Sequence, residues 1–195
     1  QESLHAVGSI KFDIDLAARR LQLEDIRADL GSECRARPLW AAASTHEGEE
    51  QLVLDAYVAL QARGIQTRLL LAPRHPNRTP EIIKLLDARG LCFQKRSDQA
   101  LLRADTDILL IDTLGELSAF LGLADAAFIG GSLVPRGGHN PIEGAAWGCA
   151  VMTGPHVINF ATIVKDMERN GAIRVVQDES ELARQLASVW SEDRI

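Results

Sequence analysis

Short apolar runs alternate with longer amphipathic stretches along most of this chain. From Pro38 onward, several runs are apolar at successive positions, which is typical of strands buried on both faces of a parallel sheet. These runs read PLWAAAS, QTRLLLAP, DILLIDT, AAFIGGS, AVMTGP and IRVVQ. We predict a β-strand in each of them, and CFQKRS indicates one more short strand.

Segments of helical length and period separate most of these strands. Leu52, Ala56 and Leu60 recur at the spacing of one helical face, and residues 82–86 carry a second apolar stripe. Strands and helices that alternate in this order imply right-handed crossovers and an open sheet. We therefore predict an α/β, Rossmann-like domain over residues 38–195, with a mostly parallel β-sheet flanked by helices.

Residues 1–37 follow a different pattern. The stretch HAVGSIKFDIDL can hold a short strand, and DLAARRLQLEDIRADLG predicts a charged amphipathic helix that ends at Gly31. Because this segment does not begin a strand–helix unit, we interpret it as an interdomain linker or edge segment. Gln1 in the place of a methionine is compatible with processing or with a fragment of a longer chain.

Composition narrows the classes of ligand. The chain has 195 residues, 46% hydrophobic and 25% charged, as expected for one sizeable globular core. Its formal net charge of −6 argues against a general nucleic-acid-binding surface. An anionic ligand would therefore need local positive charge, which Arg74, His75 and Arg78 supply in one segment and Arg136 and His139 in another.

The cysteine spacing argues against a metal site, and the length of the apolar runs argues against a membrane span. Cys34, Cys92 and Cys149 show no CxxC spacing, so we interpret them as reduced thiols in or near the core and expect no metal site. No apolar run approaches the length of a membrane span and no signal peptide is visible. We expect the chain itself to be soluble and cytoplasmic.

Candidate chemistry lies after the predicted strands, because parallel sheets bind ligands beyond the carboxyl ends of their strands. The segments at those positions read STHEGEE, PRHPNRTPE, LGEL and GGSLVPRGGHNPIEGAA. The chain has neither GxGxxG after its first strand nor GxxxxGK[ST] anywhere, which argues against NAD(P) binding and P-loop phosphoryl transfer.

Several of these segments carry helix-start signals. The pairs with capping-box spacing are Ser44 with Glu47, Thr113 with Glu116, and Asn140 with Glu143, and Thr79 stands before Pro80. One interpretation is purely structural: each pair satisfies backbone N–H groups at a helix start. The other is that several helix N-termini converge on one crevice and offer N–H groups to an anion. Both can hold at once.

The basic and glycine-rich segments also have two interpretations each. Arg74 and His75 lie between two prolines and suit contact with a phosphate or carboxylate, or form a solvated basic loop. His139 precedes the predicted cap Asn140, where it can reach a phosphate or hydrogen-bond to backbone. Glu143 can accept hydrogen bonds from ribose hydroxyls or cap the helix.

Taken together, and in this order, four blocks resemble the 3-deoxy-D-manno-octulosonic acid (Kdo) transferases of lipopolysaccharide synthesis. The blocks are ASTHEGEE, APRHPNR, DTLGEL and ADAAFIGGSLVPRGGHNPIEGAAWGCAVMTGPHVINF, and GSIKFDI is similar to the interdomain segment of that family. The resemblance implies a two-domain GT-B glycosyltransferase of which this chain is the C-terminal half. That half holds the donor CMP-Kdo in the family.

The resemblance also implies roles for individual residues. Arg74, with His75, would face the CMP phosphate or the Kdo carboxylate. The loop Thr113, Leu114, Gly115 and Glu116 matches the cytosine pocket, with leucine at position 114 where the family usually has methionine.

The glycine-rich segment and the first block carry the remaining implied roles. Gly138, His139 and Asn140 match the segment near phosphate and ribose, and Glu143 matches the ribose-binding acid. Gly144 departs from the common proline and should loosen the first helical turn. Ser44, Thr45, His46 and Glu47 match a block near the cleft.

The implied function is donor binding in the transfer of Kdo from CMP-Kdo to a lipid A precursor at the cytoplasmic face of the inner membrane. The resemblance implies that the missing N-terminal half supplies the acceptor site, the membrane-associating surface and the catalytic base. Within this chain, His46 and His139 are weak candidates for that base. We expect no cofactor and no nucleic-acid partner. The alternatives are another GT-B-type enzyme, such as an epimerase or UDP-sugar transferase, and a non-enzymatic nucleotide-binding module.

Overall fold

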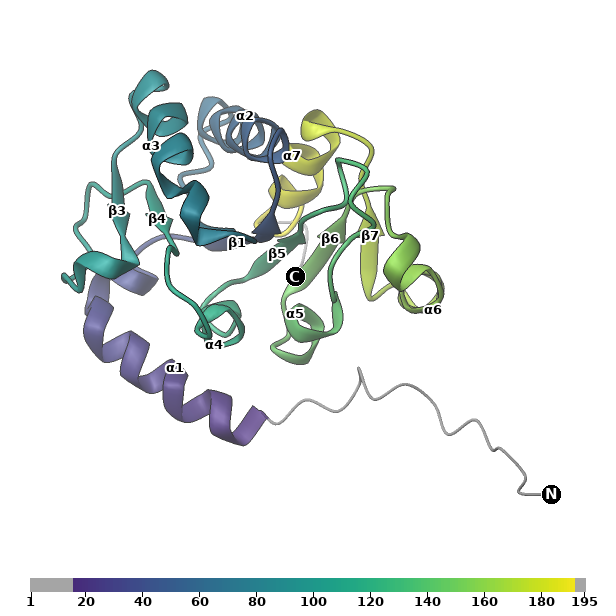
Figure 1. The fold of residues 1–195 in the computed structure, drawn as a ribbon, viewed down its shortest axis with the longest axis horizontal. Coiled ribbons are helices and arrows are strands. Elements are labelled where there is room, and N and C mark those ends of the chain that lie inside the picture. The colour runs from purple at the N-terminus through teal and green to yellow at the C-terminus, as the bar shows by residue number, and fades with distance from the viewer. Residues whose placement is uncertain (1–15, 192–195) are drawn as a thin grey trace.

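The computed structural model describes residues 16–191, whose centre is a seven-stranded sheet with every strand pair parallel (Figure 1). Its strand order is β3-β4-β2-β1-β5-β6-β7. The strands are β1 (Leu39–Thr45), β2 (Arg68–Pro73), β3 (Phe93–Lys95), β4 (Ile108–Leu110), β5 (Ala126–Ile129), β6 (Ala150–Thr153) and β7 (Ile173–Val175). Each predicted run from Pro38 onward, CFQKRS included, therefore contains a strand. The strand predicted in HAVGSIKFDIDL lies outside the described residues.

Helices cover both faces of the sheet. They are α1 (Leu16–Leu30), α2 (Glu49–Ala62), α3 (Thr79–Ala88), α4 (Leu117–Leu121), α5 (Ile142–Ala146), α6 (Ala161–Arg169) and α7 (Glu179–Ala187). Short 3-10 turns occupy Ser32–Arg35, Pro76–Arg78, Arg96–Asp98 and Ile158–Phe160. The predicted α/β architecture is confirmed.

Alternation along the strands divides the core into two layers. In β1, Trp40 and Ala42 face the layer formed with α2, α3 and α7, whereas Ala41 and Ala43 face the layer formed with α1 and α4. Because both faces of the central strands are buried, their sequences are almost continuously apolar.

Helix α1 packs against this domain through one face. Leu23, Ile26 and Leu30 are buried in the layer that also contains α4, and the helix ends at Gly31 with φ of 73°. The helix and its end are as predicted. The division of the whole protein at residue 37 stays a prediction.

The strand order reverses between β1 and β5. From β1 the chain moves to β2 on one side, and β5 pairs with β1 on the other side. At such a switch point the loops beyond the two strands diverge and leave a crevice. The segments that border this crevice are 46–48 and 130–141.

Two further expectations concern membranes and cysteines. No helix within residues 16–191 combines the length and apolarity needed to span a bilayer. Cys34 and Cys149 are buried free thiols, but Cys92 is exposed, so its predicted place near the core is wrong.

Candidate functional site

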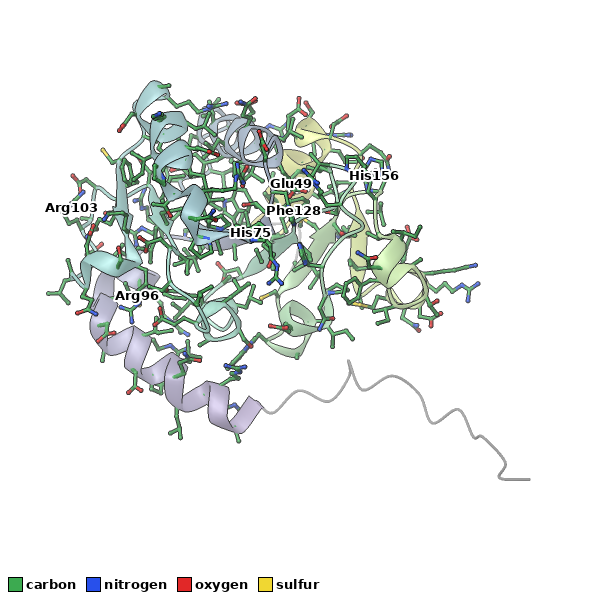
Figure 2. The ribbon with its side chains drawn as sticks, viewed as in Figure 1. Glu49, His75, Arg96, Arg103, Phe128 and His156 are labelled. Carbon is green, nitrogen blue, oxygen red and sulfur yellow. The ribbon has the colours of Figure 1, made fainter. Side chains whose placement is uncertain are left out.

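The carboxylate of Glu49 joins the two loops at the switch point. It accepts backbone hydrogen bonds from His46 (3.2 Å), Gly131 (2.7 Å), Ser132 (3.0 Å) and Leu133 (2.9 Å). Figure 2 shows Glu49 where α2 begins, close to Phe128 of β5 in this view. Burial raises the pKa of Glu49, and the backbone N–H groups oppose that shift. The N–H groups of residues 131–133 are thus satisfied by the protein's own carboxylate.

Two glycines make this arrangement possible. A Cβ on Gly130 would lie 2.7 Å from the Ser44 carbonyl oxygen and 2.8 Å from a Glu49 carboxylate oxygen. Gly131 has φ of 67°, and a Cβ there would lie 3.1 Å from the His139 ring. The close approach of the two loops therefore requires glycine at both positions.

Two histidines from opposite sides of the crevice form a hydrogen-bonded pair. Nε2 of His46 lies 2.8 Å from Nε2 of His139, with the ring planes parallel. One nitrogen donates and the other accepts, so at least one ring is neutral. Burial, followed by the charges of His46, Arg74 and His75, lowers the pKa of His139 to about 4. Burial, followed by the charges of His75 and Arg136, also lowers the pKa of His46.

The β2–α3 segment brings the predicted basic residues to the same edge of the sheet. The Arg74 N–H donates to the Thr45 carbonyl (2.9 Å), and its exposed side chain forms no ion pair with residues 16–191. Arg78 instead forms two hydrogen bonds with the fully buried Glu50, at 2.6 and 3.2 Å. Of these arginines, Arg74 is the one left available to a ligand, while Arg78 anchors the segment.

The ring of His75 completes a group of three imidazoles. It lies edge-on to His46 with ring centroids 5.8 Å apart. The structure therefore brings His75, His46 and His139 together, although they come from three different loops.

The 113–116 loop follows β4, and its shape depends on Glu116. The Glu116 carboxylate accepts hydrogen bonds from Arg96 (2.9 and 3.2 Å) and from the Thr113 hydroxyl. Arg96 also pairs with Asp29 of α1 at 2.8 Å, and Figure 2 shows it beside that helix. The predicted capping box is wrong, because Thr113 bonds the Glu116 side chain and α4 begins later, at Leu117.

The tip of this loop is open. Leu114 is 81% exposed, and Gly115 has φ of 82°. The Gly115 carbonyl accepts a hydrogen bond from Gln22 of α1 at 3.3 Å. Helix α1 thus supports the loop through two contacts. One is the direct hydrogen bond to Gly115, and the other runs through Arg96 to Glu116.

The predicted cap at Ser44 is also wrong. Ser44 has φ of 56° at an irregularity in the β1–β2 register, and α2 begins only at Glu49. Gly48, with φ of 86°, precedes the helix, and Glu49 rather than the exposed Glu47 bonds back to an N–H, that of His46. Glu49 was not among the predicted site residues, although it lies in the acidic run EGEE.

The glycine-rich segment starts α5 nearly as predicted. The Asn140 side-chain oxygen accepts the N–H of Ile142 at 3.2 Å, and Pro141 precedes the first helical residue. The reciprocal Glu143 bond is absent within residues 16–191, so that part of the capping box is wrong and the half-buried carboxylate is not used as a cap. Gly138, with φ of 74°, donates its N–H to Gly131 at 2.8 Å.

Helix α3 begins at Thr79, with Pro80 as its second residue. The Thr79 hydroxyl donates to the Pro76 carbonyl at 2.7 Å. The predicted start is therefore confirmed, with the cap one residue earlier than expected.

Some cavities of the described residues lie outside the histidine group. A cavity of about 420 Å³ lies between the 130–141 loop and the segment after β6, and its lining is mainly apolar: Pro135, Gly137, Pro155, His156, Val157, Ile158 and Ala161. A larger one, about 710 Å³, lies at the amino ends of β1 and β5, beside Trp147 and Trp190. Among the described residues, no cluster of His, Cys, Asp or Glu could hold a metal ion.

Two curated proteins similar to this chain share one description. The chain is 39% identical over 176 residues to the 3-deoxy-D-manno-octulosonic acid transferase of Haemophilus influenzae, covering 90% of this chain and 41% of that protein. It is 40% identical over 169 residues to the transferase of the same name from Bordetella pertussis, covering 85% and 39%. The chain thus spans about two fifths of these relatives. No protein-family model matches it.

Solved structures support the fold. The C-terminal CMP-Kdo binding domain of WaaA from Acinetobacter baumannii matches with a TM-score of 0.83 and 29% identity, over 91% of both chains. The C-terminal domain of a group 1 glycosyl transferase from Francisella tularensis matches in fold alone, with a TM-score of 0.51 and 16% identity over 90% of this chain. The expected resemblance, and the Rossmann-like fold of a GT-B C-terminal half, are confirmed.

Proposed function

We propose that this chain, a homologue of the Kdo transferases, is a donor-binding domain that holds CMP-Kdo in the crevice between β1 and β5. The whole enzyme would transfer Kdo to a lipid A precursor at the cytoplasmic face of the inner membrane. The observation that carries the proposal is the match to a CMP-Kdo binding domain over 91% of both chains. We expect the acceptor site and the catalytic base in the part of the protein that precedes this domain.

Different residues of the crevice bind different parts of the donor. Arg74, exposed and unpaired within residues 16–191, binds the phosphate or the Kdo carboxylate. His139 lies close enough to Arg74 for its pKa to be affected by the Arg74 charge. The open tip at Leu114 and Gly115 reads the cytosine edge through backbone groups. Glu143, not used as a helix cap, accepts hydrogen bonds from the ribose hydroxyls.

Transfer begins when the bond between the Kdo anomeric carbon and the phosphate oxygen breaks. The electron pair goes to the phosphate, and the Kdo ring gains oxocarbenium-like charge. Arg74 stabilises the negative charge on the departing phosphate, as preorganised electrostatics. The acceptor hydroxyl loses its proton to a base outside this chain.

A nucleotide panel tests donor binding. We expect CMP to bind more tightly than UMP or UDP in calorimetry, because the base pocket selects cytosine. A preference for UDP would favour another GT-B-type enzyme, and the proposal is wrong if no cytidine nucleotide binds. A non-enzymatic nucleotide-binding module would instead bind CMP without any transfer by the full-length protein.

Substitution of Glu143 tests the ribose contact. We expect Glu143→Gln to reduce the preference for CMP over dCMP, with the base and phosphate contacts retained. Glu179→Gln is a matched control, because Glu179 lies in the first turn of α7 and is not part of the proposed site. An unchanged CMP/dCMP ratio in Glu143→Gln would remove this residue from the ribose site.

A further inference from the structure

The direct contact between His46 and His139 has no part in the transfer scheme above. Both rings use Nε2 in the bond, at 2.8 Å. In the neutral pair, the donating ring therefore has an unprotonated Nδ1, and the accepting ring carries its proton on Nδ1. Addition of one proton at the free Nδ1 keeps the Nε2–H···Nε2 bond and creates one new N–H donor.

The charges around the pair are unbalanced toward positive. Arg74 and His75 face it from the β2–α3 segment, and Arg136 faces it from the β5–α5 loop. Arg78 also faces the pair, but its charge is matched by Glu50.

Two acidic groups at this edge, Glu49 and Glu50, are already engaged by other partners. Glu49 accepts four backbone hydrogen bonds and Glu50 binds Arg78. Burial disfavours a proton on the pair, and the cations that remain disfavour it further, which accounts for the lowered pKa values of both histidines. An anion in the crevice would offset the charges of these cations and favour a proton on the pair.

We propose that His46 and His139 act as one proton-sharing unit that takes up a proton from solvent when an anionic group enters the crevice. The anion is a phosphate or carboxylate oxygen group, and the protonated pair binds it through its added charge and N–H donor. Donor affinity is then linked to pH. This inference rests on the proposed function for the identity of the anion, but the pair itself does not depend on it.

Calorimetry of CMP binding in two buffers with different ionisation enthalpies measures proton uptake directly. We expect an uptake of about half a proton or more per CMP near neutral pH, and an affinity that falls by up to about tenfold between pH 7 and pH 8. His139→Gln and His46→Gln should each abolish the uptake and flatten the pH profile. His156→Gln, an exposed histidine in the segment after β6, is the control and should retain both.

Nitrogen NMR of the histidine rings, with sulfate as an anion that does not titrate in this range, separates this inference from the proposed function. If CMP does not bind but sulfate raises the pKa of the pair, the proposed function fails and the proton-sharing unit stands. If CMP binds with no proton uptake, the unit is wrong and donor binding stands. If neither anion shifts the titration of the pair, the unit is also wrong.

Discussion

At the scale of single residues, the two arginines of the basic segment after β2 have different roles. Arg78 is bound to the buried Glu50, whereas the Arg74 side chain is exposed. We expect Arg74→Ala to weaken CMP binding by about 1.5–3 kcal/mol, the usual worth of a hydrogen bond to a charged group. Calorimetry measures the loss.

The matched control is Arg63→Ala, at the exposed end of α2 on the opposite edge of the sheet. Its substitution should leave CMP affinity unchanged, because it removes the same charge far from the crevice. Equal affinity in wild type and Arg74→Ala would remove Arg74 from the site.

His139 predicts a dependence of stability on pH. Its pKa in the folded chain is about 4, below the ordinary value of 6.5. As pH falls from about 6.5 toward 4, the unfolded chain gains a proton that the folded chain does not, so stability decreases. Because the ring is only half-buried, we expect a loss of about 1 kcal/mol.

Urea unfolding of the ligand-free chain at several pH values measures this loss. His139→Gln should show a shallower decrease, since it removes the titrating group. The same slope in the variant would assign the decrease to other groups.

At the scale of elements, Glu49 connects the start of α2 to the loop after β5. Glu49→Gln leaves one acceptor oxygen and turns an NH₂ group toward backbone N–H donors. We expect the free energy of unfolding to fall by about 2–4 kcal/mol, because charge-assisted hydrogen bonds are lost in a buried position.

Urea unfolding tests this prediction, with Glu47→Gln as the control. Glu47 is exposed two residues earlier, and its substitution should change stability by less than about 0.5 kcal/mol. Equal stabilities of the two variants would show that the Glu49 bonds contribute little.

Strands were easier to predict than the loops that connect them to helices. The strands were predictable because burial on both faces demands continuous apolar runs, and all of those predicted from Pro38 onward are present. The start of α2 was not, because the left-handed backbone at Ser44 and Gly48 delays the helix to Glu49. Local spacing carries no information on such backbone angles.

The candidate site was predictable only in part, for a similar reason. Arg74 and the 137–140 segment could be placed at the sheet edge from their position after strands. The contact between His46 and His139 joins positions 93 residues apart, and only the strand order brings them together. No short motif encodes that distance.

At the scale of the whole molecule, binding and chemistry should be separable. Since the chain spans about two fifths of its relatives and we assign it no catalytic base, we expect the isolated chain to bind CMP but not to transfer Kdo. An assay with CMP-Kdo and a lipid A precursor checks this, with the full-length protein as the positive control. Transfer by the chain alone would contradict the prediction.

The glycine at position 131 has an evolutionary consequence. Its backbone angle would admit an occasional asparagine or aspartate, but the rings of His139 and His46 leave no room for a Cβ without displacement. We therefore expect a lineage that keeps both rings to keep glycine here, and one that replaces a ring with a smaller side chain to tolerate other residues. In aligned relatives, we expect positions 46, 131 and 139 to change together.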